Sequence, residues 1–142
     1  MYSAFSQRGI SLIEVLVAIV IISLGLLGMA GLQAAGLRTG HSSLYRAQAA
    51  QLANDMAERM RANLGDALNY GLLMTDAAPV GAVTRDRDRA DWLARIQELP
   101  SGDGSIAIDA PNNLVTITVQ WDDTRAGGPN NAAFVMATRL WN

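Results

Sequence analysis

The chain has 142 residues, no cysteine and a net charge of −2, with 11 basic and 13 acidic residues. The lack of cysteine excludes disulfides, thiolate nucleophiles and cysteine-ligated metals. The acidic balance, with a pI near 5.2 and no cluster of basic residues, argues against nucleic acid as a partner, since binding it requires a basic face. The length allows one ordinary domain, or a membrane segment followed by a small domain.

The first predicted element is an apolar segment that begins at Ile10. No side chain from Val15 to Leu37 is charged, and 23 helical residues extend about 35 Å, enough to cross a hydrocarbon core of about 30 Å. A secretory signal peptide has a shorter apolar region of about 7–15 residues without an acid, although "AGLQAAG" resembles a cleavage site. A simple anchor explains the length but not Glu14, and a buried soluble helix would need a larger domain around it.

Glu14 is the one acid in this apolar segment. An acid inside lipid is disfavoured by up to a few kcal/mol at mid-membrane, so its presence implies a partner. Arg8, near the membrane surface, is one candidate. The other is the α-amine of Ile10, which becomes a positive charge four residues from Glu14 if the chain is cut after Gly9.

The stretch "RGISLIEVLVAIVIISLGLLG" resembles the class III signal sequence of type IV pilins and of the pseudopilins of type II secretion. Gly9, Ile10 and Glu14 fall on the last leader residue, the first mature residue and the fifth-position glutamate of that pattern. Ile10 stands where phenylalanine is usual. The resemblance implies cleavage by prepilin peptidase after a leader of residues 1–9, N-methylation of Ile10, and a role for Glu14 in neutralising a neighbouring subunit's amine during assembly.

Gly25, Gly28 and Gly31 recur every three residues in the apolar segment. Each weakens a helix by roughly 1 kcal/mol relative to alanine. Small residues allow close packing of helices in membranes. The alternative is a point where the helix loosens as it leaves lipid, which the resemblance to pilins favours. Both explanations remain open from the residues alone.

Residues 42–62 are predicted to continue the helix with an amphipathic pattern, and Asn63 and Gly65 are its stop signals. The apolar face consists of Ala49, Leu52, Ala53, Met56, Ala57 and Met60. With the apolar segment this makes one helix of about 50 residues, roughly 75 Å long. His41, the single histidine, is expected to be solvated rather than catalytic or metal-binding.

Residues 66–87 lack periodicity and are predicted to be a loop with short helical turns. A second helix is expected from about Arg87 to Leu99, with an apolar face of Trp92, Leu93, Ile96 and Leu99. The alternating charges of residues 85–89 are expected to neutralise one another in solvent. No calcium-loop spacing is present.

The last part of the chain alternates as strands do: "SIAIDA", "LVTITVQW" and "AFVMATRLW". Asp122 and Asp123 are expected to form the turn after the second strand. The predicted fold is therefore α+β: a long N-terminal helix, half transmembrane and half amphipathic, packed on a small antiparallel sheet of about three strands. This is also the pilin architecture.

The segments "QAAQLANDMAERMRAN" and "DWLARIQELPSGDGSI", with the later strands, resemble PilV-type minor pilins. The resemblance implies a leader of residues 1–9, a transmembrane and filament-core half of residues 10–37, and a periplasmic domain of residues 38–142. It further implies an inner-membrane protein that joins a type IV pilus. The implied partners are prepilin peptidase, other minor pilins, the major pilin and a large tip adhesin. Many major pilins have a C-terminal disulfide, which this chain cannot form.

Two other functions compete with a minor pilin. A minor pseudopilin of type II secretion shares the leader and the helix. A membrane-anchored periplasmic enzyme or binding module has little support, because the chain has a single histidine, no G-x-S-x-G and no phosphate loop. We therefore expect a structural protein without catalytic residues, cofactor or metal.

Overall fold

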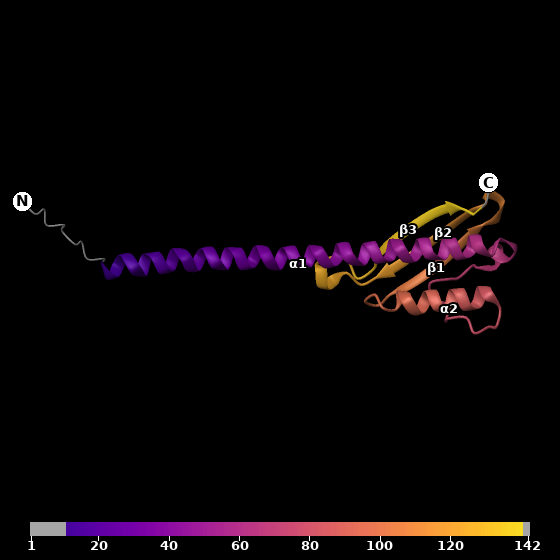
Figure 1. Ribbon diagram of the computed structural model, residues 1–142, viewed down its shortest axis with the longest axis horizontal. Coiled ribbons are helices and arrows are strands. Elements are labelled where there is room, and N and C mark those ends of the chain that lie inside the picture. Colours follow the sequence, from indigo (N-terminus) through magenta and orange to yellow (C-terminus); the bar gives the residue numbers. More distant parts are fainter. Residues whose placement is uncertain (1–10, 141–142) are drawn as a thin grey trace, which may run out of the picture. The chain divides into compact units, whose positions relative to one another are not determined.

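The computed structural model describes residues 11–140. Its helices are α1 (Leu12–Ala62), with 51 residues, and α2 (Thr84–Ile96), and its strands are β1 (Asp103–Asp109), β2 (Leu114–Trp121) and β3 (Ala132–Arg139) (Figure 1). Three short 3-10 helices are η1 (Leu64–Asn69), η2 (Ala110–Asn112) and η3 (Thr124–Ala126). A long N-terminal helix with a three-stranded antiparallel sheet confirms the predicted α+β fold class.

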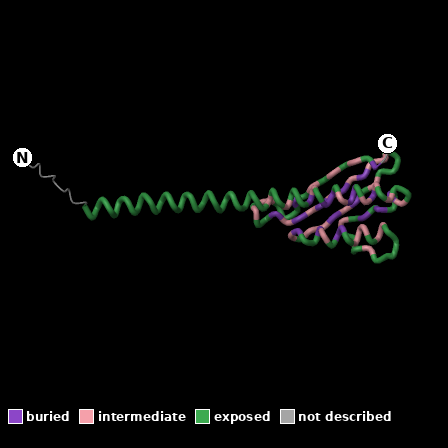
Figure 2. The backbone as a smooth tube through the Cα atoms, in the orientation of Figure 1, coloured by how far each residue is buried: buried purple, intermediate pink, exposed green. Residues whose placement is uncertain are grey.

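The chain divides into two compact units, Met1–Leu37 and Arg38–Asn142. In the first unit the described residues are Ser11 and the beginning of α1, and every one of them is exposed (Figure 2). The helix begins where the backbone N–H groups of Glu14 and Val15 donate to the Ser11 carbonyl, at 3.0 and 3.3 Å. Its side chains are apolar on all sides, except for Glu14, Ser23 and Gln33. A helix of this kind needs lipid or other helices around it.

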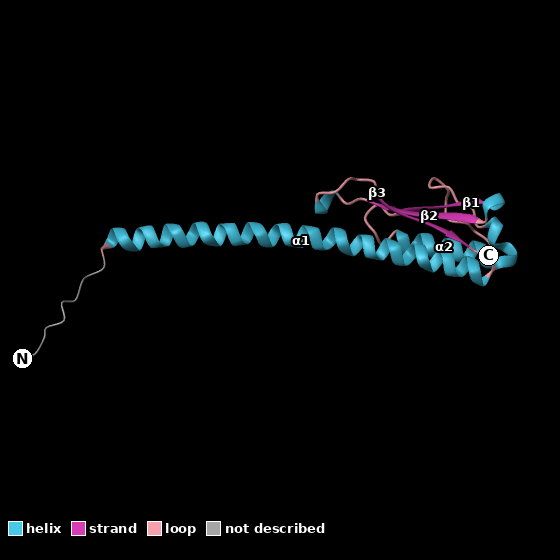
Figure 3. Cartoon of the chain, turned by 90° about the horizontal axis from the view of Figure 1, so that it is seen from above, coloured by secondary structure: helices cyan, strands magenta, loops and turns pink. Residues whose placement is uncertain are grey.

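The second unit has two layers. The end of α1 and α2 form one layer, and the sheet forms the other (Figure 3). The strand order is β1-β2-β3, and both pairings are antiparallel. Ile117 of β2 lies opposite Ile106 of β1 and Met136 of β3. The hairpin turn between β1 and β2 uses Asn113 in the left-handed conformation, at φ 52°, which asparagine adopts more readily than most residues.

The core lies between the helices and one face of the sheet. The alternating residues Val115, Ile117, Val119 and Trp121 of β2 are all buried, as is the whole predicted apolar face of α1. Trp92 and Trp121 are fully buried within it. The other face of β2 consists of Leu114, Thr116, Thr118 and Gln120, which are half-buried. Period-2 and period-3.6 patterning thus identified the parts of the core that α1 and β2 contribute.

The second helix is shifted towards the N-terminus relative to the prediction. It begins at Thr84 because the Val83 carbonyl accepts hydrogen bonds from the N–H groups of Asp86 and Arg87, at 3.1 and 3.2 Å. It ends at Ile96, and Leu99 is buried in the turn that follows. The carboxylate of Asp86 in the first turn complements the positive end of the helix dipole.

The segment predicted to be a loop, residues 66–87, is partly ordered structure. It starts inside η1, and Tyr70 and Leu72 are buried. Leu72 pairs with Ile106 as an isolated antiparallel bridge beside β1. The loop prediction missed this because a single bridging residue produces no periodicity.

Candidate functional site

Glu14 lies in the first turn of α1, where the N-terminal N–H groups favour a negative charge. Its side chain is exposed, and the structure brings no basic group of the described residues to it. The proposed processing positions, Gly9 and Ile10, lie outside the described residues. Within the single chain Glu14 therefore has a helix terminus beside it and no ion-pair partner among residues 11–140.

Gly25, Gly28 and Gly31 are exposed positions of the same helix. A methyl group added at any of the three would meet no atom within 4 Å beyond the local helix backbone. Packing within the chain therefore does not require glycine there. A requirement for glycine would come from a neighbouring helix or from the flexibility of α1 itself.

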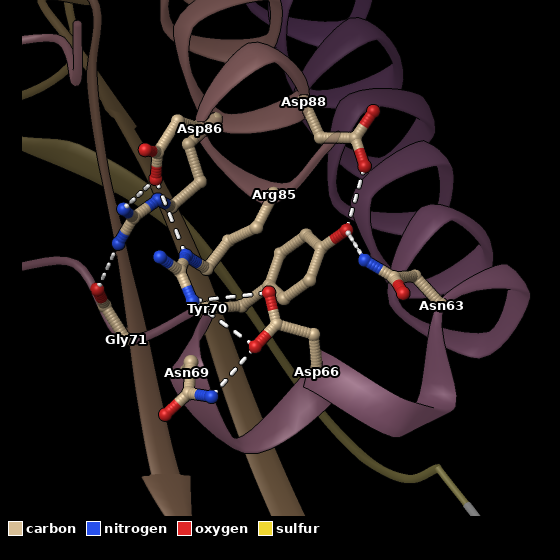
Figure 4. A network of polar contacts seen from close by, with 9 residues as sticks. Asn63, Asp66, Asn69, Tyr70, Gly71, Arg85, Asp86 and Asp88 are labelled. Carbon is tan, nitrogen blue, oxygen red and sulfur yellow. Dashed lines mark hydrogen bonds and ion pairs between the residues drawn. The ribbon is translucent and has the colours of Figure 1, made fainter. Parts of the chain in front are cut away.

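The second unit contains a polar network at the C-terminal end of α1 (Figure 4). The fully buried ring of Tyr70 directs its hydroxyl to Asp88, donating to Oδ2 at 2.6 Å, and the hydroxyl accepts from Asn63 Nδ2 at 3.1 Å. Burial and then the hydrogen bond to Asp88 raise the pKa of the Tyr70 hydroxyl above its ordinary value. Tyr70 thus joins the end of α1 to α2.

Two arginines form a second set of polar contacts next to Tyr70 (Figure 4). Arg85 makes two hydrogen bonds of 3.0 Å to the Asp66 carboxylate, which fastens α2 to η1. Arg89 donates to Asp86 at 2.7 Å and to the Gly71 carbonyl at 2.7 Å. Hydrogen bonds from Arg89 and Arg85 lower the pKa of the Asp86 carboxyl.

The prediction that the charges of residues 85–89 are simply solvated is therefore wrong in part. Arg85, Asp86, Asp88 and Arg89 are half-buried, and they connect α2 to three other segments. The mutual neutralisation itself is confirmed by the ion pairs of Asp86 with Arg85 and Arg89. The sequence pattern could not reveal which distant segments the charges would reach.

Further contacts join the two helices. Arg59 contacts Asp88 at 3.2 Å, and Arg95 contacts Asp55 at 2.7 Å. The indole N–H of Trp92 donates to the Leu52 carbonyl at 2.9 Å inside the core. These contacts hold α2 against the end of α1.

Asp123 is buried, with 4 % of its surface exposed. Its Oδ2 accepts a hydrogen bond of 2.6 Å from Ser42 of α1, while its Oδ1 has no partner among the described residues. The adjacent Asp122 remains at the surface side of the turn and accepts from the Thr124 N–H at 2.9 Å. The turn prediction holds for both, but Asp123 also fastens the turn to the long helix.

The surface of the second unit has shallow grooves. One of about 340 Å³ is lined by residues of α1, of the end of α2 and of the turn that follows α2: Tyr45, Gln48, Gln51, Leu52, Arg95, Glu98 and Leu99. Among residues 11–140, no group of three or more histidine, cysteine, aspartate or glutamate side chains is placed to hold a metal ion. His41 is exposed and lies beside the ring of Tyr45, with ring centroids 6.4 Å apart.

Comparison with protein families gives one match: residues 5–30 match the prokaryotic N-terminal methylation motif. Comparisons with curated proteins and with solved structures give no match. The family match supports the type IV pilin-like class III signal, which is typical of prepilin peptidase substrates. The described part of the chain has one helix long and apolar enough to cross a membrane, α1, and with the motif it supports membrane anchoring.

Proposed function

We propose that this chain is a minor pilin: a structural subunit that inserts in the inner membrane, is processed by prepilin peptidase, and helps to initiate assembly of a type IV pilus. One observation supports this most strongly. The N-terminal methylation motif of residues 5–30 coincides with a helix that is apolar and exposed on every side and carries a single carboxylate in its first turn. A helix of this kind is suited to bundling with copies like itself.

The proposed processing sites are Gly9, the last leader residue, and Ile10, the first mature residue. Cleavage there creates an α-amine near Glu14, and a neighbouring subunit's amine becomes its partner in the filament core. Two unit charges about 4 Å apart attract by roughly 4 kcal/mol at an effective dielectric near 20. Leaving one charge of a buried pair without its partner costs about 3–5 kcal/mol. The pair would therefore favour one register between the helices.

The proposed division of the chain follows from the same chemistry. Residues 1–9 are the leader, residues 10–37 the transmembrane and filament-core half of the helix, and residues 38–142 a periplasmic domain. After processing, the chain moves from the inner membrane into the pilus. In this account the polar network around Tyr70 keeps the periplasmic domain on the end of α1.

The likeness of the later segments to PilV-type minor pilins supports a place in a complex that starts the filament. The partners we propose are other minor pilins, the major pilin and a large tip adhesin. A minor pseudopilin of type II secretion is the second candidate, because it would carry the same leader, apolar helix and glutamate.

Affinity purification of the tagged full-length chain from membranes, in mild detergent, tests the proposal. We expect other proteins with an N-terminal methylation motif in stoichiometric amounts, and we expect the chain in filaments sheared from the cell surface. Recovery with secretion components and absence from sheared filaments would identify the pseudopilin. Recovery of the chain alone, from cells that are making pili, would contradict both functions.

A further inference from the structure

The two edges of the sheet in the second unit are built differently. The outer edge of β1 is covered by residue 72: the Leu72 N–H donates to the Ile106 carbonyl at 3.0 Å, and the Ile106 N–H donates to the Leu72 carbonyl at 2.8 Å. Asp103 and Asp109 add a charge at each end of this strand. Covering and charge are the usual means of preventing an edge strand from pairing with another chain.

The outer edge of β3 has neither protection along most of its length. Among residues 11–140, the backbone of residues 132–138 has hydrogen bonds to β2 and to no other segment. At the end of the strand, Arg61 donates to the Arg139 carbonyl at 3.3 Å. Figure 1 shows β3 as the last strand of the sheet, with no described segment beyond it. Its outward N–H and C=O groups are therefore open to a partner.

The side chains of β3 also favour pairing. Its sequence, AAFVMATR, has no proline and no lysine, and its one charge is the final Arg139. Val135 is 58 % exposed on the outer face, while Phe134 and Met136 are half-buried at the margin of the core. An exposed, apolar edge of this length is expected to associate. A further strand would cover the open sides of Phe134 and Met136.

We propose that the outer edge of β3 is a docking site for an extended segment of a different polypeptide chain, which adds a fourth strand to the sheet and places an acidic residue opposite Arg139. Strand addition uses backbone hydrogen bonds for affinity and alternate side chains for specificity. The proposal goes beyond the assembly role and does not depend on it.

Charge defines the partner's chemistry. Among the described residues, the Arg139 guanidinium has no ion-pair partner, and the rest of the strand is small or apolar. Opposite charges on adjacent strands stabilise a pairing, and like charges destabilise it. The incoming segment is therefore small or apolar over most of its length, with an aspartate or glutamate at the Arg139 end.

A second copy of this chain fits the edge poorly. The β3 strand has no acidic residue, so antiparallel pairing of two β3 strands would leave both Arg139 guanidinium groups without an opposite charge. Parallel pairing in register would place Arg139 beside the same arginine of the other copy. A different chain avoids both problems.

Hydrogen–deuterium exchange of the full-length chain tests the edge directly. The outward amides of residues 132–137 should exchange about tenfold more slowly in the membranes of the producing cells than in the purified chain in detergent. Val135→Lys should remove this difference, and Val135→Thr should retain it, because threonine keeps the β-branched shape without a charge. Val80→Lys, at a fully exposed loop position, is the matched control and should also retain it.

Equal exchange in membranes and detergent, or a difference that survives Val135→Lys, would overturn the proposal. Slower exchange in the purified chain as its concentration rises would identify a second copy as the occupant and overturn the choice of partner.

The absence of cysteine allows the partner to be mapped. A single Val135→Cys variant can carry a photoreactive maleimide, with Val80→Cys as its control. Val135 and Arg139 lie on the same face, four positions apart. We expect the cross-linked peptide to come from another protein, with an acidic residue four positions from the cross-linked one. A peptide of this chain, or one that Val80→Cys captures equally, would overturn the proposal.

Discussion

The carboxylate of Glu14 raises the free energy of the helix in lipid, and the amine of a neighbouring subunit could offset this increase. The residue is exposed in the first turn of α1, and nothing in the second unit depends on it. We therefore expect Glu14→Ala to insert in the membrane at a normal level, because removing a charge makes the helix more apolar. Incorporation into filaments should fall at least about tenfold, since a loss of 1.4 kcal/mol already changes an equilibrium that much. Immunoblots of sheared pili and of membranes measure the two quantities.

Glu58→Ala is the control for this variant. Glu58 is an exposed acid of the same helix, and its pair with Arg61 lies at the surface, where such pairs contribute little. The Glu58→Ala variant should join filaments at the normal level. Normal incorporation of Glu14→Ala would refute the register role.

The Tyr70 hydroxyl should make stability depend on alkaline pH. Because its pKa is raised in the folded chain, the folded state keeps a proton that the unfolded state has already lost. Its contribution is full below the unfolded pKa of about 10 and declines as pH rises through the folded pKa. Tyr70→Phe should cost about 1 kcal/mol at pH 7, from the lost hydrogen bond, and should unfold with a shallower pH dependence above pH 10. Denaturant unfolding of both chains at several pH values measures this; parallel curves would contradict it.

Gly104 is required by close packing in the core. A methyl group there would lie 2.6 Å from Cη2 of Trp92 and 2.7 Å from Cδ1 of Ile96, both on α2. Gly104→Ala should therefore lower the free energy of unfolding by about 1–3 kcal/mol, as overpacking does. Gly65→Ala, where a methyl group meets nothing within 4 Å, should change it by less than about 0.5 kcal/mol. Equal denaturation midpoints for the two variants would show that α2 moves aside without cost.

At the scale of elements, the glycines of α1 can be tested by side-chain size. If Gly28 permits close approach of a neighbouring helix, Gly28→Ala should join filaments nearly normally, because alanine is also small, whereas Gly28→Leu should not. Both should insert in the membrane, since both side chains are apolar and a Cβ atom at this position meets nothing within 4 Å beyond the local helix backbone. The sheared-pilus blot again provides the measurement. A failure of Gly28→Ala equal to that of Gly28→Leu would favour helix softening instead.

The elements themselves could largely be predicted, because each buries a face with its own period. The apolar face of residues 49–60 and the alternation of residues 115–121 are buried as expected. What could not be predicted depends on contacts between distant segments. Tyr70 reaches Asp88, and Leu72 reaches Ile106, only because the chain folds back on itself. The first turn of α2 was missed because apolar periodicity starts later than the helix does.

At the scale of the whole molecule, the pilin-like N-terminal signal was predictable because it is local in the sequence. The match to residues 5–30 supports the leader pattern from which the pilin-like nature was inferred. The open edge of β3 could not be predicted, because the sequence of a strand does not show whether its outer edge is paired with another strand. The polar network could not be predicted either, because alternating charges in the sequence do not show which distant residues they will contact.

We propose that residues 10–37 become an assembly helix once a leader of nine residues has been removed. The N-terminal mass of the mature chain should be measured in cells with and without prepilin peptidase. We expect a mature chain that begins with N-methylated Ile10 in the first cells and an intact leader in the second. An intact N-terminus in both, or a start near Gly36, would contradict it.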